Sequence, residues 1–403
     1  ALPDTSEFSI RPYKPHYAAD FISRPTIGYA RDNFGRGLFG GAAISLSDLL
    51  GDHMMAFAGS VNGRISEAQL YGAYTNLAHR WNWQVGGAQE VYYYYTGQST
   101  ISGDTVNQAL DRWIAREVFG RAIRPFNRFQ RLELGMYGVD LYRSTLNQLV
   151  FYDPTGIPLG EQDVITNGSN VFYALPSAAL VYDNSLFGYT SSFYGQRYRL
   201  EVGQAVGGYR YTQFVGDFRK YVSLGFPWTI AARITTVGRF GRDEGIFPTF
   251  LGTTDRVRGY TYGSYSNGEC GLNGTQAACN EFYRLIGSRM AVASAEFRFP
   301  LIRGNALGFL PIGLPPIEGV IWTDAGLAWN GGDDVHWTRP ANPAATDRWP
   351  ISSYGAGVRI NVLGFVIMSV DYAVPRNRPA WVDGTGAVHK QGGYWIVSLT
   401  PPF

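Results

Sequence analysis

The residue types that carry acid–base chemistry are scattered along this sequence rather than gathered in a motif. An enzyme must bring a nucleophile, a base and an orienting group together. The chain contains no G-x-S-x-G, H-E-x-x-H or Walker A pattern. Its five histidines are spread over the whole length, at His16, His53, His79, His336 and His389. The sequence therefore predicts no enzymatic activity, no catalytic residue and no cofactor.

One polar stretch brings metal-ligating side chains close together, at Asp333, Asp334 and His336. Carboxylate and imidazole groups bind divalent cations, but the same residue types are common in solvated loops. We interpret these three residues as part of a solvated loop. The sequence therefore predicts no metal site.

A charged turn in "TTDRVRGYTYG" (residues 253–263) is the more specific feature. Arg258 lies between Val257 and the pair Gly259-Tyr260. A glycine permits a tight turn, and a guanidinium offers a planar fork of donors that matches a carboxylate. A charged turn of this kind needs a carboxylate partner for Arg258. The strands and loops that carry the two groups determine which carboxylate that is.

Composition favours a membrane-embedded β protein. Of 403 residues, only 16% are charged, 15% are aromatic and 50 are Gly. No run of 18 apolar residues occurs, and the nearest candidate, 305–322, is interrupted by Pro311, Pro315 and Pro316. Low charge and many aromatic residues without long apolar blocks are typical of transmembrane β-barrels.

The charge balance argues against nucleic acid as a partner, whereas the strong preference for Arg over Lys has more than one explanation. Basic and acidic residues number 34 and 32, so nucleic acid is not an expected partner. Apart from Lys14, Lys220 and Lys390, every basic residue is Arg. This bias suits arginine–carboxylate pairs in a polar lumen or contacts with lipid phosphates, and genomic base composition would produce it as well.

Apolar and polar residues alternate in many segments. In 81–93, Trp81, Trp83 and Val85 fall on one face and Asn82 and Gln84 on the other, and 194–202 and 228–239 alternate in the same way. Period-two alternation indicates strands with two chemically different faces. In a membrane barrel the apolar face contacts lipid and the polar face lines the lumen.

The alternating segments number sixteen: 19–31, 36–49, 52–62, 66–77, 81–96, 112–123, 129–143, 170–183, 190–206, 210–224, 228–240, 286–299, 317–329, 351–361, 365–374 and 393–403. Short turns alternate with long polar loops, namely 97–111, 144–169, 241–285, 330–350 and 375–392. Short periplasmic turns opposite long external loops are typical of outer-membrane proteins. The sequence predicts an all-β, 16-stranded antiparallel transmembrane β-barrel in the bacterial outer membrane.

The ends of the chain fit this prediction. We expect residues 1–18 to be an N-terminal linker or extension and residues 19–403 to be the barrel. The chain begins without a basic segment followed by an apolar one, so we interpret it as a mature form or a fragment. The last strand ends on the aromatic Phe403, although the preceding Pro401-Pro402 is unusual there.

Parity along the predicted strand 317–329 supplies a partner for the charged turn. Asp324 shares a face with Glu318, Trp322 and Gly326, and this face should line the lumen. A loop folded into the lumen would bring Arg258 against Asp324, in a bidentate pair that fixes the loop. Gly259 would allow the turn, and Tyr260 would pack on the lumen wall.

The two cysteines lie in the same predicted loop, at Cys270 and Cys279. Two lone cysteines in a polar loop favour a disulfide formed in an oxidising compartment. A zinc site is disfavoured because no histidine lies nearby.

Three motifs in order resemble the BamA superfamily: "VRGY" (257–260), "MAVASAEFRFP" (290–300) and "WTDAGLAW" (322–329). The resemblance implies a sixteen-stranded barrel whose sixth external loop, here 241–285, folds into the lumen. Arg258, Gly259 and Tyr260 match the V-R-G-F/Y turn of that loop. Asp324 and Gly326 match the strand motif that receives the arginine. The cysteine pair is similar to the disulfide of BamA, whereas the POTRA domains that usually precede such barrels have no counterpart in this chain.

The superfamily comprises outer-membrane assembly factors, TamA-like proteins and two-partner secretion translocators. The resemblance implies a lateral seam between the first and last strands. Pro25 lacks an amide donor and Gly392-Gly393 weaken pairing, so with Phe403 they mark the expected seam. Expected partners are outer-membrane lipid and lipopolysaccharide, unfolded outer-membrane or secreted client proteins, and accessory subunits.

A passive barrel is the alternative function, either as a pore or as the membrane anchor of a further N-terminal domain. It rests on the charged residues predicted to face the lumen, which are Arg131, Glu133, Arg197, Arg199, Glu201, Asp217, Arg219 and Arg233. Any water-filled barrel needs such a lining. Loop length alone would also suit a surface receptor or adhesin.

Overall fold

The computed structural model describes residues 13–23, 25–32, 35–63, 65–102, 105–153, 155, 158–265, 280–302, 316–362, 366–376, 378, 380–382 and 387–399. They divide into two compact units. The first unit is Ala1–Arg124 with Leu134–Pro176, and the second is Pro125–Glu133 with Ser177–Phe403. Strands β8 and β9 each contribute several residues to both units, and Pro125, the last residue of β7, belongs to the second unit.

The first unit is an antiparallel meander. Its strands are β1 (Ala18–Ile22), β2 (Thr26–Asp32), β3 (Gly35–Ser47), β4 (His53–Gly63), β5 (Gln69–Asn76), β6 (Asn82–Ser102), β7 (Thr105–Pro125) and most of β8 (Gln130–Tyr152) and β9 (Pro158–Asp183). The 3₁₀ turn η2 (Ile65–Glu67) connects β4 to β5. Both β1 and β2 pair with β3, so they are two parts of one strand interrupted near Pro25.

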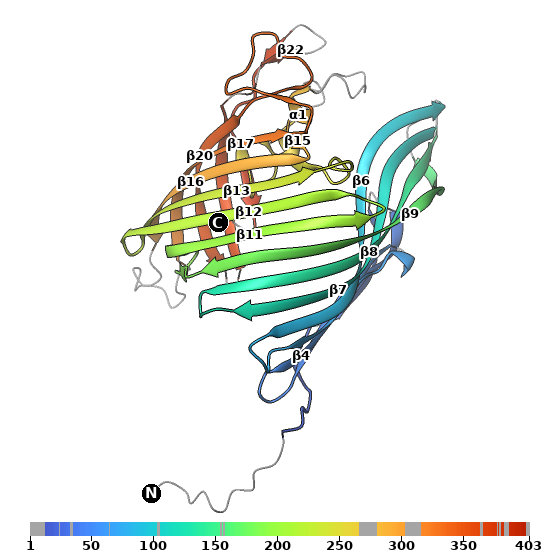
Figure 1. Cartoon of the computed structure of the whole chain (residues 1–403). Helices are drawn as coiled ribbons and strands as arrows, with labels where there is room; N and C mark the ends of the chain where they lie inside the picture. The colour runs from blue at the N-terminus through green and yellow to red at the C-terminus, as the bar shows by residue number, and fades with distance from the viewer. Residues whose placement is uncertain are drawn as a thin grey trace, which may run out of the picture. The chain divides into compact units, whose positions relative to one another are not determined.

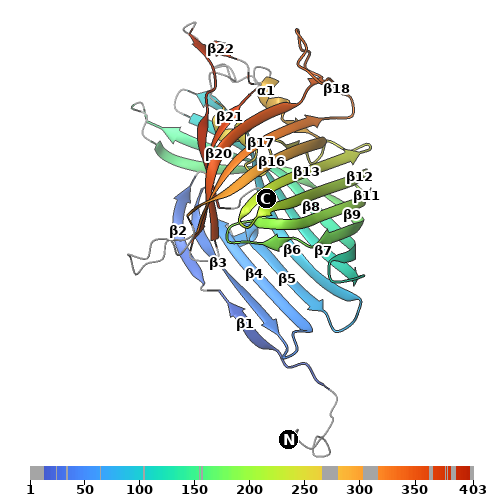
Figure 2. The same ribbon diagram turned by 90° about the vertical axis from the view of Figure 1, so that its left-hand side faces the viewer.

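The second unit continues the antiparallel order. Its long strands are β11 (Ser192–Gly207), β12 (Tyr211–Gly225), β13 (Trp228–Phe240), β16 (Arg289–Ile302), β17 (Ile317–Trp329), β20 (Ile351–Val362), β21 (Val366–Pro375) and the short β24 (Tyr394–Ser398). Figure 1 shows β11, β12 and β13 side by side, and Figure 2 shows β16, β17, β20 and β21 as neighbours.

Small elements occupy the connections of the second unit. They are β10 (Leu186–Phe187), β14 (Thr249–Phe250), η3 (Arg258–Tyr260), η4 (Tyr262–Ser264), α1 (Asn280–Tyr283), β15 (Ile286–Gly287), β18 (Asp334–Val335), β19 (Asp347–Arg348), β22 (Trp381–Val382) and β23 (Val388–His389). Between β13 and β16, the strands β14 and β15 pair with each other. The described part of the connection that carries the charged turn therefore has regular structure of its own.

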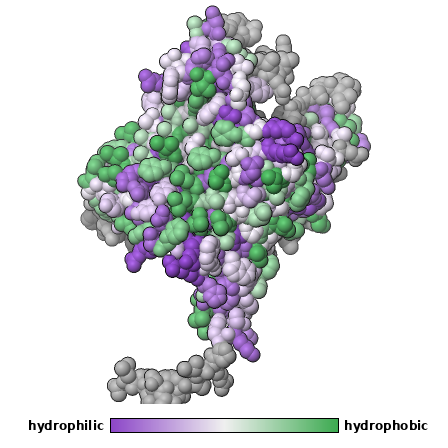
Figure 3. Space-filling view, in the orientation of Figure 1, coloured by the Kyte–Doolittle hydropathy of each residue, from purple (hydrophilic) through white to green (hydrophobic). Residues whose placement is uncertain are grey.

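The strands have the two-faced character that alternation predicts. On β13, the side chains of Trp228, Ile230 and Ile234 are exposed, whereas Thr229 and Ala231 are buried. Apolar side chains gather on the exposed face of β11, β12 and β13 (Figure 3). Apolar groups on an exposed strand face are stable when lipid rather than water covers them.

Every predicted strand has a counterpart among the described residues. The large antiparallel sheet contains eighteen strands. Counting β1 and β2 as one interrupted strand and setting aside the two-residue β10 leaves the sixteen that alternation predicted. The boundary at residue 18 stays a prediction, and residues 1–12 lie outside the described residues.

Two predicted loops were wrong. Much of 97–111 belongs to β6 and β7, whose ladder continues to the pair Ser102↔Thr105. Much of 144–169 likewise belongs to β8 and β9. A membrane span needs only about 9–11 residues of strand. Beyond that length lipid no longer covers one face, so the hydrophobic alternation ends although the strands continue, and alternate residues such as Ser144, Leu146 and Gln148 remain buried.

No helix among the described residues is long and apolar enough to cross a membrane.

The exposed apolar face of β13 leads to a stability prediction. Ile234 is the central residue of β13 and is exposed. Replacing it with Arg should place a charge against hydrocarbon and lower the free energy of unfolding in a phospholipid bilayer by about 2–4 kcal/mol. Ile234→Leu is the matched control and should have little effect. Equal stability of the two variants in urea titrations would show that this face does not contact lipid.

Candidate functional site

The connection between β13 and β16 is anchored by a compact apolar cluster. Its buried members are Leu251, Val257, Tyr260, Leu285, Met290, Val292, Ala328 and Ile351. The first four belong to the connection, and the others belong to β16, β17 and β20. This packing holds the connection against three strands of the sheet.

Two glycines make room for this contact. A Cβ on Gly326 of β17 would lie 2.7 Å from Val257 Cγ2 and 3.1 Å from a methyl of Leu251. A Cβ on Gly259 would lie 2.4 Å from the Cβ of Ser353 and 3.1 Å from the Cα of Pro375. A Cβ at either position would force a neighbouring atom to shift, so glycine at both positions lets the connection pack here without displacing its neighbours.

Arg258 and Asp324 form a buried bidentate pair. Arg258 Nε donates to Asp324 Oδ2 and Nη2 donates to Oδ1, each at 2.8 Å. The backbone N–H of Arg258 also donates to Asp324 Oδ2, at 3.2 Å. Each residue is only 1% exposed. Charge-assisted bidentate contacts are among the strongest polar interactions in proteins.

A second carboxylate shares the arginine. Arg258 Nη1 donates to Glu296 of β16 at 3.0 Å. Glu296 also accepts hydrogen bonds from Arg359 at 2.7 Å and from Arg298 at 2.9 Å. All of these side chains are buried, so one carboxylate serves three guanidinium groups without bulk water.

An aromatic ring completes the surroundings of Arg258. The guanidinium carbon lies 3.8 Å from the centre of the Trp322 ring. The indole N–H of Trp322 donates to Asp371 Oδ1 at 2.9 Å, and that oxygen lies 3.9 Å from Arg258 Nη1. Cation–π contact is strongest over tryptophan and in desolvated sites.

The neighbouring strands also hold the backbone of the turn. Ser353 Oγ of β20 accepts a hydrogen bond from the Gly259 N–H at 3.1 Å. The hydroxyl of Tyr394, on β24, donates to the Arg258 carbonyl at 2.8 Å and accepts from the Thr261 N–H at 3.0 Å. The turn is therefore fastened to β17, β20 and the last described strand of the sheet.

The carboxylates decide the protonation of Arg258. Burial alone would lower the pKa of this guanidinium, but the charge and hydrogen bonds of Asp324 raise its pKa above the ordinary value. Arg258 therefore stays charged. A charge buried this completely depends on its partners, and removing one partner of such a pair costs about 3–5 kcal/mol.

The charged cluster continues to a connection at the other end of the strands. Arg298 donates to the carbonyl of Ser192 at 2.8 Å. The hydroxyls of Thr190 and Ser191 donate to Glu318 at 3.0 and 2.7 Å, and Glu318 lies 4.0 Å from Arg359. Residues 190–192 are thus joined to the Arg258 site through two buried arginines.

Parity along the strands indicated Asp324 but not the whole cluster. Glu296 alternates with apolar residues within the quoted motif 290–300, and the β16–β17 register places it opposite Trp322. Arg359 and Tyr394 lie on β20 and β24. Parity places a residue on a face, but it does not show which residues of that face meet across several strands.

The other predicted positions have separate surroundings. Pro25 is exposed between β1 and β2, and Gly393 lies against the ring of Tyr372 just before β24. Gly392 is exposed. Cys270, Cys279 and Phe403 lie outside the described residues, so their pairing and contacts stay predictions.

The predicted solvated loop has an ion-pair network. Asp333 lies 3.1 Å from Arg348 Nε, and His336 Nε2 lies 2.9 Å from Asp347. In the described part of the chain, no group of three or more His, Cys, Asp or Glu side chains is arranged to hold a metal ion.

Comparison with known proteins decides the family. The model of the Omp85 superfamily domain matches residues 177–393, just over half of the chain. The chain belongs to the Omp85 superfamily. This matched segment contains the complete Arg258 cluster except Tyr394, which follows its last residue. Omp85 proteins are proteins of the bacterial outer membrane, so the predicted location is confirmed.

Two solved structures share the fold. BamA from Haemophilus ducreyi lacking POTRA domains 1-3 is similar with a TM-score of 0.55 and 16% identity, over 96% of this chain and 70% of that chain. CdiB from Escherichia coli has a TM-score of 0.51 and 12% identity, over 96% of this chain and 63% of CdiB. No curated protein matches by sequence. These likenesses confirm the predicted fold class.

A double-mutant cycle tests the buried pair. Arg258→Ala and Asp324→Ala should each lower the free energy of local opening around Arg258 by about 3–5 kcal/mol, because each leaves an unpaired buried charge. The double variant should cost little more than either single variant. Hydrogen exchange at the amides of Arg258, Gly259 and Thr261 measures this opening. Additive losses would contradict the pairing.

Glycine substitutions test the close approach independently of charge. Gly259→Ala should speed trypsin cleavage after Arg256, because the added Cβ collides with Ser353 and overpacking costs about 1–3 kcal/mol. Gly263→Ala is the matched control, since a Cβ there has no neighbour within 4 Å. Equal cleavage of the two variants would show that the turn does not need this contact.

Proposed function

We propose that this Omp85 protein assembles or translocates polypeptides at the outer membrane, through a lateral seam between its first and last strands. In this proposal the turn at Arg258 is a lock that keeps the β13–β16 connection seated next to the seam. The observation that carries it is the pair of hydrogen bonds between the Tyr394 hydroxyl and the backbone of that turn, one donated to the Arg258 carbonyl and one accepted from the Thr261 N–H. The position of the connection is therefore coupled to the position of the last strand.

The proposed seam rests on weak pairing at both ends of the strand order. Among the residues that the structure describes, which end at Leu399, β24 pairs with β21 over five positions, from Ser369↔Ser398 to Ala373↔Tyr394. At the other end, β1 and β2 are separated at Pro25, which cannot donate to a ladder. Short or interrupted pairing lowers the free energy needed to separate a strand, which a seam requires.

The proposed partners follow from this mechanism. Unfolded outer-membrane or secreted proteins would be the clients, accessory subunits would assist, and outer-membrane lipid and lipopolysaccharide would surround the strands. A disulfide between Cys270 and Cys279 would further restrict the connection that contains the lock.

A passive pore or a membrane anchor for a further N-terminal domain is the second candidate. Partly exposed ion pairs favour it: Arg199 bonds both Glu133 and Glu201 at 2.7 Å, and Asp217 bonds Arg219 and Arg233. Such pairs suit a wet, charged lining. A passive role does not explain why three arginines, Arg258, Arg298 and Arg359, are buried around Glu296 of β16.

Client folding and ion conduction separate the two candidates. The protein in proteoliposomes should speed the folding of a urea-denatured eight-stranded outer-membrane protein. Arg258→Ala should slow that folding at least tenfold, while single-channel conductance stays within a factor of about two. Tyr394→Phe removes one hydroxyl and should slow folding by roughly two- to tenfold.

Two matched variants serve as controls. Arg242→Ala removes an exposed arginine from the same connection, and Tyr354→Phe removes an exposed hydroxyl from β20. Both should fold the client at the unmodified rate. If Arg258→Ala changes only conductance, the passive candidate is correct.

A further inference from the structure

An apolar trough crosses the exposed face of the first unit. Its volume is about 600 Å³. The trough is deep where Gly72, Gly87 and Gly138 lack side chains. The strand register places Gly72 opposite Gly87, and Gly87 opposite Val118. Val118 and Phe172 form its walls and are 67% and 65% exposed. The trough is therefore a linear apolar depression between side chains that face lipid.

A polar hollow of about 370 Å³ adjoins the trough, and Arg116 lines both. The other residues around the hollow are Ser66, Arg112, Ile114, Tyr142 and Asn170. Arg112 is buried and is fixed by Glu67 and by Ser144 at 3.0 Å. Donors from two arginines, a serine, a tyrosine and an asparagine thus surround one small space.

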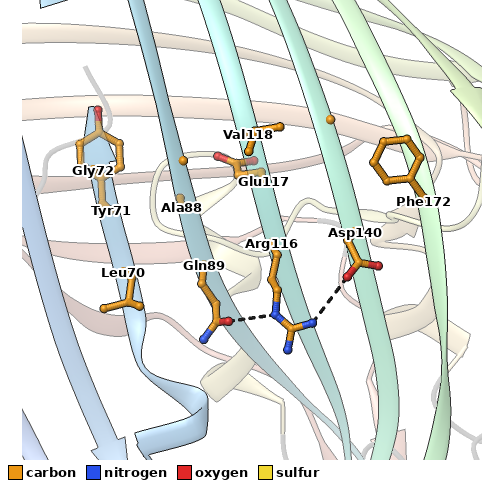
Figure 4. A pocket seen from close by; sticks show the side chains of 12 residues that line it. Leu70, Tyr71, Gly72, Ala88, Gln89, Arg116, Glu117, Val118, Asp140 and Phe172 are labelled. Carbon is orange, nitrogen blue, oxygen red and sulfur yellow. Dashed lines mark hydrogen bonds and ion pairs between the residues drawn. The ribbon is translucent and has the colours of Figure 1, made fainter. Parts of the chain in front are cut away.

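Arg116 is held in place without being fully neutralised. Its Nε donates to Gln89 at 3.0 Å, and its Nη1 lies 3.5 Å from Asp140 (Figure 4). The side chain of Arg116 is 50% exposed. A long, exposed ion pair of this kind contributes little free energy. The guanidinium can therefore take a phosphate oxygen as a stronger, charge-assisted partner.

The order of the two spaces along β7 matches the depth of an outer-leaflet lipid. A membrane strand needs about 9–11 residues to cross hydrocarbon. Strand β7 ends at Pro125, at the short turn before β8. Arg116 lies nine residues before Pro125 and Arg112 lies thirteen residues before it. The trough at Val118 therefore lies within hydrocarbon and the polar hollow lies at its external boundary.

We propose that the first unit binds a phosphorylated lipid of the outer leaflet, with a phosphate of lipid A in the hollow at Arg116 and an acyl chain in the glycine trough. The inference rests on the lipid partner of the proposed function and names its site. A polar hollow continuous with an apolar trough is complementary to a lipid in charge and in shape. A soluble anion would not need the trough.

Binding of purified lipids to the full-length chain in detergent tests this site by native mass spectrometry. The probes are bisphosphorylated lipid A, dephosphorylated lipid A and phosphatidylglycerol. The phosphorylated lipid A should bind at one copy per chain and about tenfold more tightly than the other two. Equal binding of the dephosphorylated form would overturn the phosphate site, and tighter binding of phosphatidylglycerol would overturn the assignment to the outer leaflet.

Paired variants separate the hollow from the trough. Arg116→Ala should weaken binding about tenfold, whereas Arg121→Ala should not, because Arg121 lies on the other face of β7 against Phe119 and Tyr137. Gly138→Leu should fill the trough, since its Cβ would make only ordinary contacts, at 3.4 Å from Val118 and 3.7 Å from Phe172. Gly120→Leu is its control, with no neighbour within 4 Å.

Unchanged lipid binding in Arg116→Ala or Gly138→Leu would refute the site. Folding measurements on the purified variants show whether a loss reflects an unfolded protein. Lipid binding is measured without a client protein. The lipid site can therefore be refuted while the proposed function stands, and the proposed function can be refuted while the lipid site stands.

Discussion

The burial of one positive charge is the constraint on which the second unit depends. Taking a guanidinium out of water costs several kcal/mol even after the protein relaxes. Arg258 recovers this cost only when Asp324, Glu296 and the face of Trp322 all surround it. A half-seated turn would leave charges both dry and unpaired. The connection between β13 and β16 should therefore have two states, seated and released, with little population between them.

Sharing of counter-charges extends this constraint to the strands. Glu296 binds Arg258, Arg298 and Arg359, which arise from one connection and two strands. Through Arg298 and Glu318 the same cluster reaches residues 190–192. Displacement of any one member changes the electrostatic surroundings of the others. The strands from β16 to β24 therefore behave as one support for the turn rather than as separate walls.

Sequence patterns were sufficient for the strands because lipid imposes a strict contrast between two faces. Alternation in segments such as 228–239 identified strands, and parity placed Asp324 with Trp322. The same reasoning failed at 97–111 and 144–169, where lipid no longer imposes the contrast between the two faces but the strands continue. Glu296, Arg359 and Tyr394 escaped prediction because their contacts depend on strand positions in space. Parity carries no information about which inward side chains meet.

The hydrogen bonds of Tyr394 have a consequence for the order of folding. This hydroxyl contacts the Arg258 carbonyl across 136 residues of sequence. Contacts of such long range form late, because the chain entropy of closing the intervening loop must be overcome first. The turn cannot reach its final hydrogen bonding until β24 has joined β21. The hydrogen bonds between Tyr394 and the turn therefore form only in a molecule whose last strand has paired. In a partly folded molecule that lacks this pairing, the turn would not be held by these bonds.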